Sequence, residues 1–150
     1  MIAIALFLAA VSWTSHETGK PIPAGAIRVD ESLYVCRAKL PDGVHPGVSD
    51  GGPCLVPQKG VAQAFDAYEV AVGASYSWRA ADWESAIVAG KQGRNGDLYV
   101  CRVRVTAASG KSIFAGGKAY RTGNHAGHCY VAHEGKEVDF AGEFELLVSR

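Results

Sequence analysis

The sequence predicts an all-β fold in which two tandem repeats form one antiparallel, β-sandwich-like domain with a pseudo-twofold axis. Three observations predict it: a duplicated strand sequence, frequent turn residues, and very little sequence that suits a helix. The 150 residues include 18 Gly and six Pro, which favour many short turns. Apolar residues make up 48% of the chain, enough to form a core.

The duplication is clearest in a five-residue run, Leu-Tyr-Val-Cys-Arg, which occurs at 33–37 and again at 98–102. Each copy has, in the same order, a Trp, an Ala-Ile pair, this run, a Gly-rich loop, a second Cys, and a closing aromatic-Glu-aliphatic run. We therefore predict a first repeat over 13–73 and a second repeat over 78–150, joined by a short linker and sharing one core.

The repeated runs are expected to be strands because they are rich in aromatic and β-branched residues and are bounded by Gly, Asp and Pro. Alternation along a strand places Tyr34 and Cys36 on one face and Arg37 on the other. Turn residues between the runs are spaced as in antiparallel hairpins. Only the segments 63–65 and 78–84 have the composition of a helical turn.

The first 12 residues are apolar and uncharged, and they end in the small-x-small pattern that signal peptidase cleaves. The run lacks the basic residues of a usual signal peptide and is too short to span a bilayer. Two interpretations of 1–12 stay open: a remnant of a secretory signal, and an apolar N-terminal strand of the domain. We expect no transmembrane segment.

Charge and motifs limit the function classes. Fifteen basic and 15 acidic residues give a net charge of zero, without the basic surplus typical of proteins that bind nucleic acid. The sequence contains no Gly-x-Ser-x-Gly nucleophile elbow, no phosphate-binding loop and no His-Glu-x-x-His zinc motif. We therefore expect a binding module rather than an enzyme, with no catalytic residues, no cofactor and no nucleic-acid partner.

The four cysteines fall two in each repeat, one on the Tyr-Val-Cys-Arg strand and one on a later strand. Four cysteines allow three pairings, and the duplication favours Cys36 with Cys54 and Cys101 with Cys129. An extracellular location would permit both disulfides. In a cytoplasmic protein the same cysteines would serve as small buried apolar side chains.

Histidines gather near the second cysteine of the second repeat, where His125, His128, Cys129 and His133 occur within nine residues. Imidazole and thiolate are zinc ligands, but on a strand His128 and Cys129 point to opposite faces. The first repeat has no matching histidines. We therefore expect a structural or surface role for this cluster and no metal site.

An arginine follows the first cysteine of each repeat, and a glutamate lies in each closing strand. We expect Arg37 with Glu69, and Arg102 with Glu145, to form ion pairs that brace the two repeats. The alternative is an arginine that reaches a ligand.

The order Trp, Pro-x-Gly-Ala, Leu-Tyr-Val-Cys-Arg, Pro-Gly, Cys, Tyr-Glu-Val resembles the DM-nine repeat family, whose repeat also occurs in natterin-like toxins. The resemblance covers nearly the whole chain, from Trp13 to Val148. It implies a domain of two repeats, and in some members a mannose-binding lectin of innate recognition that often forms homodimers. A secreted, non-enzymatic carbohydrate-binding module is therefore expected. The alternative is a secreted structural or protein-interaction module whose sugar site has decayed.

In mannose-binding members an Asp before the Tyr-Val strand and a Lys after a Pro-Gly turn hold the sugar. In the second repeat of this chain the Asp position reads Gln92 and the Lys position reads Lys118. In the first repeat Asp30 is the nearest acid, and Val48 replaces the lysine. The resemblance thus implies one asymmetric site, with Asp30 and Lys118 drawn from the two repeats; alternatively, both are solvated loop residues. The aromatic residues expected to line that site are Tyr120 and Trp83.

Overall fold

The computed structural model describes residues 11–149 of the chain. The segment 1–12 lies outside this range except for its last two residues, of which Ser12 begins the first strand. Regular structure in the described range is β, apart from one 3-10 turn, η1, at Gly93–Asn95. No helix among these residues is long and apolar enough to cross a membrane. The predicted all-β class is confirmed.

The strands divide into two sets of seven, one in each half of the chain. The first set is β1 (Ser12–Glu17), β2 (Arg28–Asp30), β3 (Leu33–Leu40), β4 (Gly43–Ser49), β5 (Cys54–Gln58), β6 (Val61–Phe65) and β7 (Ala67–Val72). The second set is β8 (Tyr76–Ala80), β9 (Val88–Gln92), β10 (Gly96–Thr106), β11 (Ser112–Tyr120), β12 (Cys129–His133), β13 (Lys136–Phe140) and β14 (Glu145–Ser149). The segment 63–65 and the start of 78–84, which have the composition of a helical turn, lie within β6 and β8 because strand pairing outweighs local propensity.

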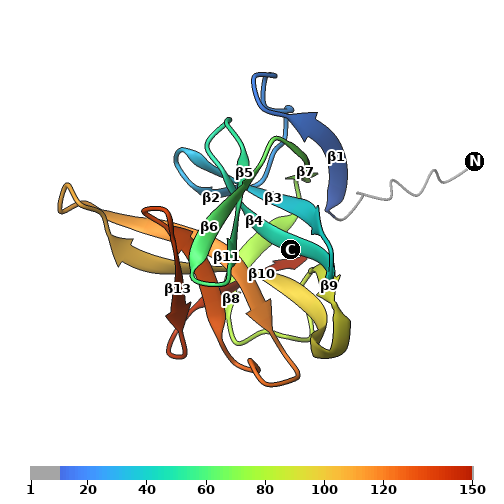
Figure 1. Ribbon diagram of the computed structural model, residues 1–150, viewed down its shortest axis with the longest axis vertical. Helices are drawn as coiled ribbons and strands as arrows, with labels where there is room; N and C mark the ends of the chain where they lie inside the picture. Colours follow the sequence, from blue (N-terminus) through green and yellow to red (C-terminus); the bar gives the residue numbers. More distant parts are fainter. Residues whose placement is uncertain (1–10, 150) are drawn as a thin grey trace, which may run out of the picture.

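Both sets follow one plan, and all of their pairings are antiparallel. In the first set β1 pairs with β7, β7 with β3, β3 with β4, and β5 with β6. In the second set β8 pairs with β14, β14 with β10, β10 with β11, and β12 with β13. Trp13 lies opposite Ala71 as Trp78 lies opposite Leu147, so equivalent residues take equivalent partners. Figure 1 shows the two halves packed against each other.

Eight strands form a closed circuit, which the sequence pattern does not predict. Hydrogen-bonded neighbours run β4, β5, β6, β13, β12, β11, β10 and β9, and β9 pairs again with β4. The circuit therefore closes through two contacts between the halves, β6 with β13 and β4 with β9. At the first contact Ala62 N donates to Gly135 O and Glu137 N donates to Gly60 O, at 3.0 and 3.1 Å. This reciprocal exchange follows a pseudo-twofold relation.

One disulfide bond in each half joins two of its strands. Cys36 in β3 is bonded to Cys54 in β5, and Cys101 in β10 is bonded to Cys129 in β12. All four cysteines are fully buried. The predicted pairing within each repeat is confirmed.

The predicted ion pairs are also present. Arg37 Nε donates to Glu69 Oε1, and Arg102 Nε donates to Glu145 Oε1, both at 2.9 Å. Each guanidinium group also lies over the first tryptophan of its own repeat, Trp13 at 4.2 Å and Trp78 at 4.5 Å.

The same arginines join the two halves. Arg37 Nη1 donates to the carbonyl of Ala89 in β9, and Arg102 Nη1 donates to the carbonyl of Val29 in β2, both at 3.1 Å. Each arginine therefore satisfies a backbone acceptor of the other repeat while it is held by the glutamate of its own repeat. The two repeats are thereby joined by charge-assisted hydrogen bonds as well as by strand pairing.

Candidate functional site

A polar cavity of about 300 Å³ opens where the two halves meet, close to the β4–β9 contact. Its volume is at the lower end of the range of roughly 300–1,000 Å³ typical of ligand sites. Its wall combines charged, amide and aromatic groups from both halves. The residues that line it are Asp42, Gln58, Lys59, Gln92, Lys118, Tyr120, His125, Tyr130 and Glu137.

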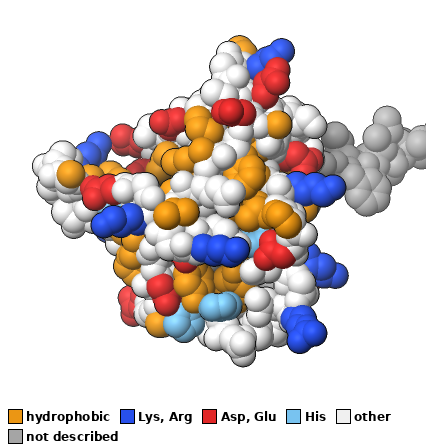
Figure 2. Space-filling view, viewed as in Figure 1, with side chains coloured by type: hydrophobic (Ala, Val, Ile, Leu, Met, Phe, Trp, Pro, Cys, Tyr) orange, Lys and Arg blue, Asp and Glu red, His pale blue; other side chains and the backbone are white. Residues whose placement is uncertain are grey.

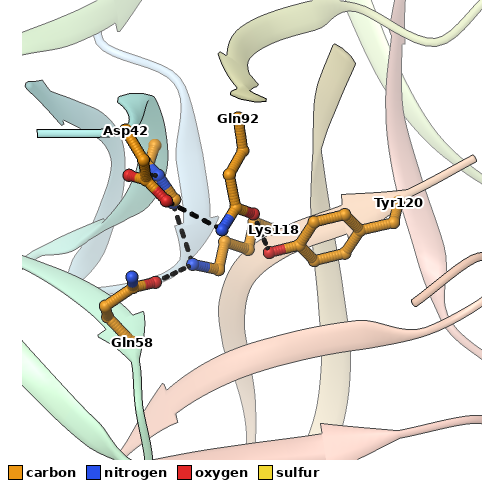
Figure 3. Close-up of polar contacts among 6 residues, drawn as sticks. Asp42, Gln58, Gln92, Lys118 and Tyr120 are labelled. Atoms are coloured by element: carbon orange, nitrogen blue, oxygen red, sulfur yellow. Dashed lines mark hydrogen bonds and ion pairs between the residues drawn. The ribbon is translucent and has the colours of Figure 1, made fainter. Parts of the chain in front are cut away.

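Lys118 is the centre of this site. It lies on β11 with only 1% of its surface exposed, and its ammonium donates to Gln58 Oε1 at 2.7 Å and to His45 Nδ1 at 2.9 Å. Figure 3 shows the side chain reaching from β11 toward groups of the first repeat. Burial lowers the pKa of Lys118 to about 8, against the opposing attraction of Glu137 and Asp42.

His45 connects Lys118 to a carboxylate. The imidazole is fully buried, and its Nε2 lies 2.8 Å from Asp42 Oδ1. Because an ammonium group has no acceptor, Nδ1 must accept from Lys118, so the proton of the neutral ring is on Nε2, which donates to Asp42. Burial and the charge of Lys118 lower the pKa of His45, although Asp42 acts in the opposite direction. His45 is therefore neutral at neutral pH, with a defined tautomer.

Asp42 collects hydrogen bonds from a second direction. Gln92 Nε2 donates to Asp42 Oδ2 at 2.9 Å, and the hydroxyl of Tyr120 donates to Gln92 Oε1 at 2.5 Å. Burial raises the pKa of Asp42, but the hydrogen bonds from His45 and Gln92 outweigh it and lower the pKa overall. One series of hydrogen bonds leads from Tyr120 through Gln92 to Asp42, and a second leads from Lys118 through His45 to Asp42. Both series end at the Asp42 carboxylate, as Figure 3 shows in part.

Aromatic rings also line the cavity. The rings of Tyr120, His125 and Tyr130 lie 5.1 to 5.6 Å apart, measured between centroids. His125 Nδ1 and the Tyr130 hydroxyl are 2.7 Å apart. Glu137 accepts from the backbone N–H of Gly60, which places this second carboxylate at the paired hairpin turns.

The equivalent position in the other half is apolar. Lys118 lies opposite Val100 on β10, and at the matching register of the first repeat Val48 lies opposite Val35 on β3. His45 is matched in the same way by Ala115. Val48 belongs to a cluster of buried aliphatic side chains with Val29 and Val35. The pseudo-twofold scaffold therefore holds a polar site at one position and ordinary core at its counterpart.

A family model for the DM9 repeat matches residues 28–120, well over half of the chain. The chain belongs to the DM9 repeat family. Comparison with curated proteins finds no match. The DM9 match extends from β2 to the end of β11 and contains the whole hydrogen-bonded network. The residues of this network are Asp42, His45, Gln58, Gln92, Lys118 and Tyr120.

The DM9 fold brings together only some of the residues that the sequence singles out. Gln92 and Lys118 line one cavity. Asp30 lies in β2 outside that cavity, and its carboxylate accepts the backbone N–H groups of Glu31 and Phe114, both at 2.9 Å. The carboxylate linked to Lys118 belongs to Asp42 instead.

Sequence reasoning missed Asp42, His45 and Gln58. Asp42 lies in a Pro-Asp-Gly turn, where aspartate is a common turn residue, and His45 precedes a proline. Neither position therefore carries a signal of ligand binding in the sequence. Only the β3–β4 hairpin, held against β9 and β11, brings both residues to Lys118.

Trp83 lies in a different place from the one expected. It lines a larger, mainly apolar cavity of about 650 Å³ on the second repeat, together with Phe114 and Phe144. Its ring contacts Tyr99 and Phe144 edge-on, at 5.3 and 6.2 Å between centroids. Tyr120, in contrast, lines the cavity that contains Lys118.

The histidine cluster of the DM9 protein has other partners. Cys129 is in a disulfide, and His128 Nδ1 lies 2.7 Å from Oδ1 of Asp139 on β13. His133 lies 3.7 Å from Glu134 at the adjoining turn. Within 11–149 no three histidine, cysteine or acidic side chains are grouped as metal ligands.

Proposed function

We propose that this DM9 protein is a secreted, non-enzymatic, lectin-like module that binds a mannose-type carbohydrate in the cavity around Lys118. The observation that carries the proposal is the convergence of a buried ammonium and a carboxylate on one small open cavity. Membership in the DM9 family supports a carbohydrate as the kind of partner.

Unused hydrogen-bonding capacity explains why a sugar suits this cavity. Two of the three ammonium protons of Lys118 are assigned to Gln58 and His45, which leaves one donor. Each oxygen of Asp42 accepts one bond from the network and keeps a further lone pair. A sugar hydroxyl both donates and accepts, so neighbouring hydroxyls can accept from Lys118 and donate to Asp42.

The aromatic border supplies the second element of sugar recognition. One face of a pyranose ring presents C–H groups, which pack favourably against aromatic rings, while the polar ends of Tyr and His remain available for hydrogen bonds. The half-buried rings of Tyr130 and His125 offer both kinds of group beside the cavity, whereas Tyr120 is nearly buried. A charged ligand is less suitable, because the cavity already balances Lys118 and Lys59 against Asp42 and Glu137.

The two disulfide bonds support a secreted location for the protein. Stable disulfides are typical of proteins that reside in oxidising, extracellular compartments. A cytoplasmic location would require both bonds to survive a reducing environment. The DM9 resemblance also leads us to propose a homodimer, which light scattering on the purified chain would test.

Binding of methyl α-mannoside, followed by calorimetry and by a glycan array, tests the function. Lys118→Met keeps the volume of the side chain but removes its donors, and we expect it to weaken binding by about tenfold or more. The matched control is Lys111→Met, because Lys111 is exposed and has a single distant ion pair, at 3.8 Å to Glu31.

Two outcomes would contradict this proposal: no glycan bound by the natural chain, or equal binding by both variants. Absence of binding would favour a structural or protein-interaction module with a decayed site. The observation behind that alternative is Gln92, which occupies the position of the sugar-binding Asp.

A further inference from the structure

We infer that His45, oriented by Asp42, is the positioning residue for Lys118, and that protonation of His45 releases the carbohydrate. This inference rests on the proposed function and adds regulation of ligand affinity by pH at the same site. His45 does not line the cavity itself; it acts through Lys118, to which it presents Nδ1.

The hydrogen-bond directions require a neutral imidazole. Lys118 Nζ and His45 Nδ1 are 2.9 Å apart, and only Nδ1 of this pair can accept. A proton on Nδ1 would place two donors, both positively charged, face to face. Both side chains are almost completely buried, so water screens the repulsion only weakly.

The charged groups around His45 do not compensate for a second cation. Asp42, from the β3–β4 turn, is the carboxylate hydrogen-bonded to Nε2. Lys118 reaches the other side of the ring from β11, and Glu137 on β13 attracts the Lys118 ammonium. Lys59 and His125, at the edge of the cavity, add no negative charge. Protonation would therefore break the bond between His45 and Lys118.

Loss of this hydrogen bond would leave the Lys118 ammonium without a fixed position. Gln58 would remain as a single partner for the ammonium, which could then turn away from the position it holds between Gln58 and His45. The donor offered to the sugar would lose its fixed direction, and a second positive charge would lie beneath it. Binding is therefore expected to fall as the pH drops through the pKa of His45, which lies below its ordinary value.

The other half of the molecule supplies an internal comparison. At the pseudo-twofold counterpart both members of the pair are replaced, His45 by Ala115 and Lys118 by Val48. The scaffold therefore folds with two small apolar side chains at the counterpart, so a buried imidazole is not a requirement of the fold itself. The joint presence of His45 and Lys118 at one position, and their joint replacement at the other, points to a functional pair.

Mannoside affinity measured on the full chain from about pH 7.5 to about pH 5 tests the inference. We expect the affinity of the natural chain to fall by about tenfold or more toward acid pH. His45→Asn keeps an acceptor near the position of Nδ1 but does not titrate, so this variant should bind without the acid loss. His45→Ala removes the acceptor and should bind weakly at every pH.

Two other histidines serve as controls. His128→Asn, which alters an imidazole paired with Asp139 outside the cavity, should keep the acid loss. His133→Asn should also keep it, because His133 lies outside the cavity, 3.7 Å from Glu134. An acid loss that persists in His45→Asn, or that vanishes in His133→Asn, would overturn the assignment to His45, as would full binding by His45→Ala.

A measurement without ligand separates this inference from the proposed function. Nitrogen NMR of the imidazole should show His45 with Nε2 protonated and Nδ1 bare near neutral pH, and a change of state only at acid pH. If no mannoside binds at any pH, the proposed function fails, and the spectrum still shows whether Nδ1 of His45 is free to accept from Lys118. A proton on Nδ1 near neutral pH would refute the positioning role.

Discussion

At the scale of single residues, Lys118 shows how a costly buried charge is accommodated. Removing an ammonium group from water is unfavourable unless hydrogen bonds and opposite charge replace the lost hydration. Gln58 and His45 each accept a hydrogen bond from the ammonium, and Asp42 and Glu137 provide the opposite charge. The compensation is incomplete, which is why the pKa of Lys118 falls to about 8 rather than keeping its ordinary value.

This residual cost predicts an alkaline limit to the proposed sugar binding. Below about pH 8 Lys118 carries its proton, and as the pH rises through about 8 the ammonium becomes a neutral amine. A neutral amine is a weaker donor than an ammonium group, so mannoside affinity should decline between about pH 7 and pH 9. Calorimetry over this range, with a carbon NMR titration of Lys118 Cε, tests the prediction. A titration midpoint near 10.5, the ordinary value of a lysine, would contradict it.

Exchanging the carboxylate of Asp42 with the amide of Gln92 tests whether this hydrogen-bonded pair is needed for binding. Gln92→Glu would place a second carboxylate where Nε2 now donates to Asp42 at 2.9 Å, and like charges at that distance repel. We expect this variant to lose about tenfold or more in affinity. The double variant Asp42→Asn with Gln92→Glu restores one carboxylate and one amide, and it should recover part of the loss. Equal affinity for the single and double variants would show that the pair does not act as a unit.

At the scale of elements, the packing of β11 on β12 explains why a glycine precedes Lys118. A Cβ on Gly117 would lie 1.9 Å from the carbonyl oxygen of Tyr130, a backbone atom of the neighbouring strand. Gly47 in β4 is in the same situation, with a Cβ position 2.2 Å from Leu55 O. In each of these two strand pairs, β11 with β12 and β4 with β5, the backbones can approach this closely only because the glycine has no side chain. Lys118, the next residue of β11 after Gly117, lies opposite Tyr130 on β12.

Gly117→Ala should therefore be strongly destabilising. The clash involves backbone, which cannot rotate away, so we expect a loss of about 2–4 kcal/mol in the free energy of unfolding. Urea denaturation measures it. The matched control is Gly142→Ala, because a Cβ on Gly142 meets no atom within 4 Å and its backbone has no positive φ. Similar midpoints for the two variants would contradict the close-approach explanation.

At the scale of the whole molecule, two kinds of link hold the repeats. Disulfides join strands within each repeat, whereas Arg37 and Arg102 and the pairing of β6 with β13 join one repeat to the other. Since the cavity draws residues from both repeats, it depends on the links between repeats as well as on those within them. Figure 2 shows charged groups of both signs interspersed over the face drawn, consistent with a net charge of zero.

The disulfides are expected to contribute most of their effect through the unfolded chain. Replacing Cys36 and Cys54 together by Ala should lower the free energy of unfolding by about 2–4 kcal/mol, and so should the Cys101 and Cys129 pair. Urea denaturation of the two double variants tests this. Alkylation followed by intact mass should label no cysteine before reduction and four after it. Labelling before reduction would contradict the bonded state.

Sequence alone determined the all-β class and favoured the cysteine pairing and the Arg–Glu ion pairs, because the residues concerned recur in the same order in both repeats. It also picked out Gln92 and Lys118 through the family resemblance. The closed circuit of strands and the partners of Lys118 were decided only by the tertiary structure. Asp42 and His45 come from a turn and a strand far from Lys118 in the chain, and nothing local distinguishes them from ordinary turn and strand residues. Burial and long-range hydrogen bonding, which a sequence does not display, turn them into a site.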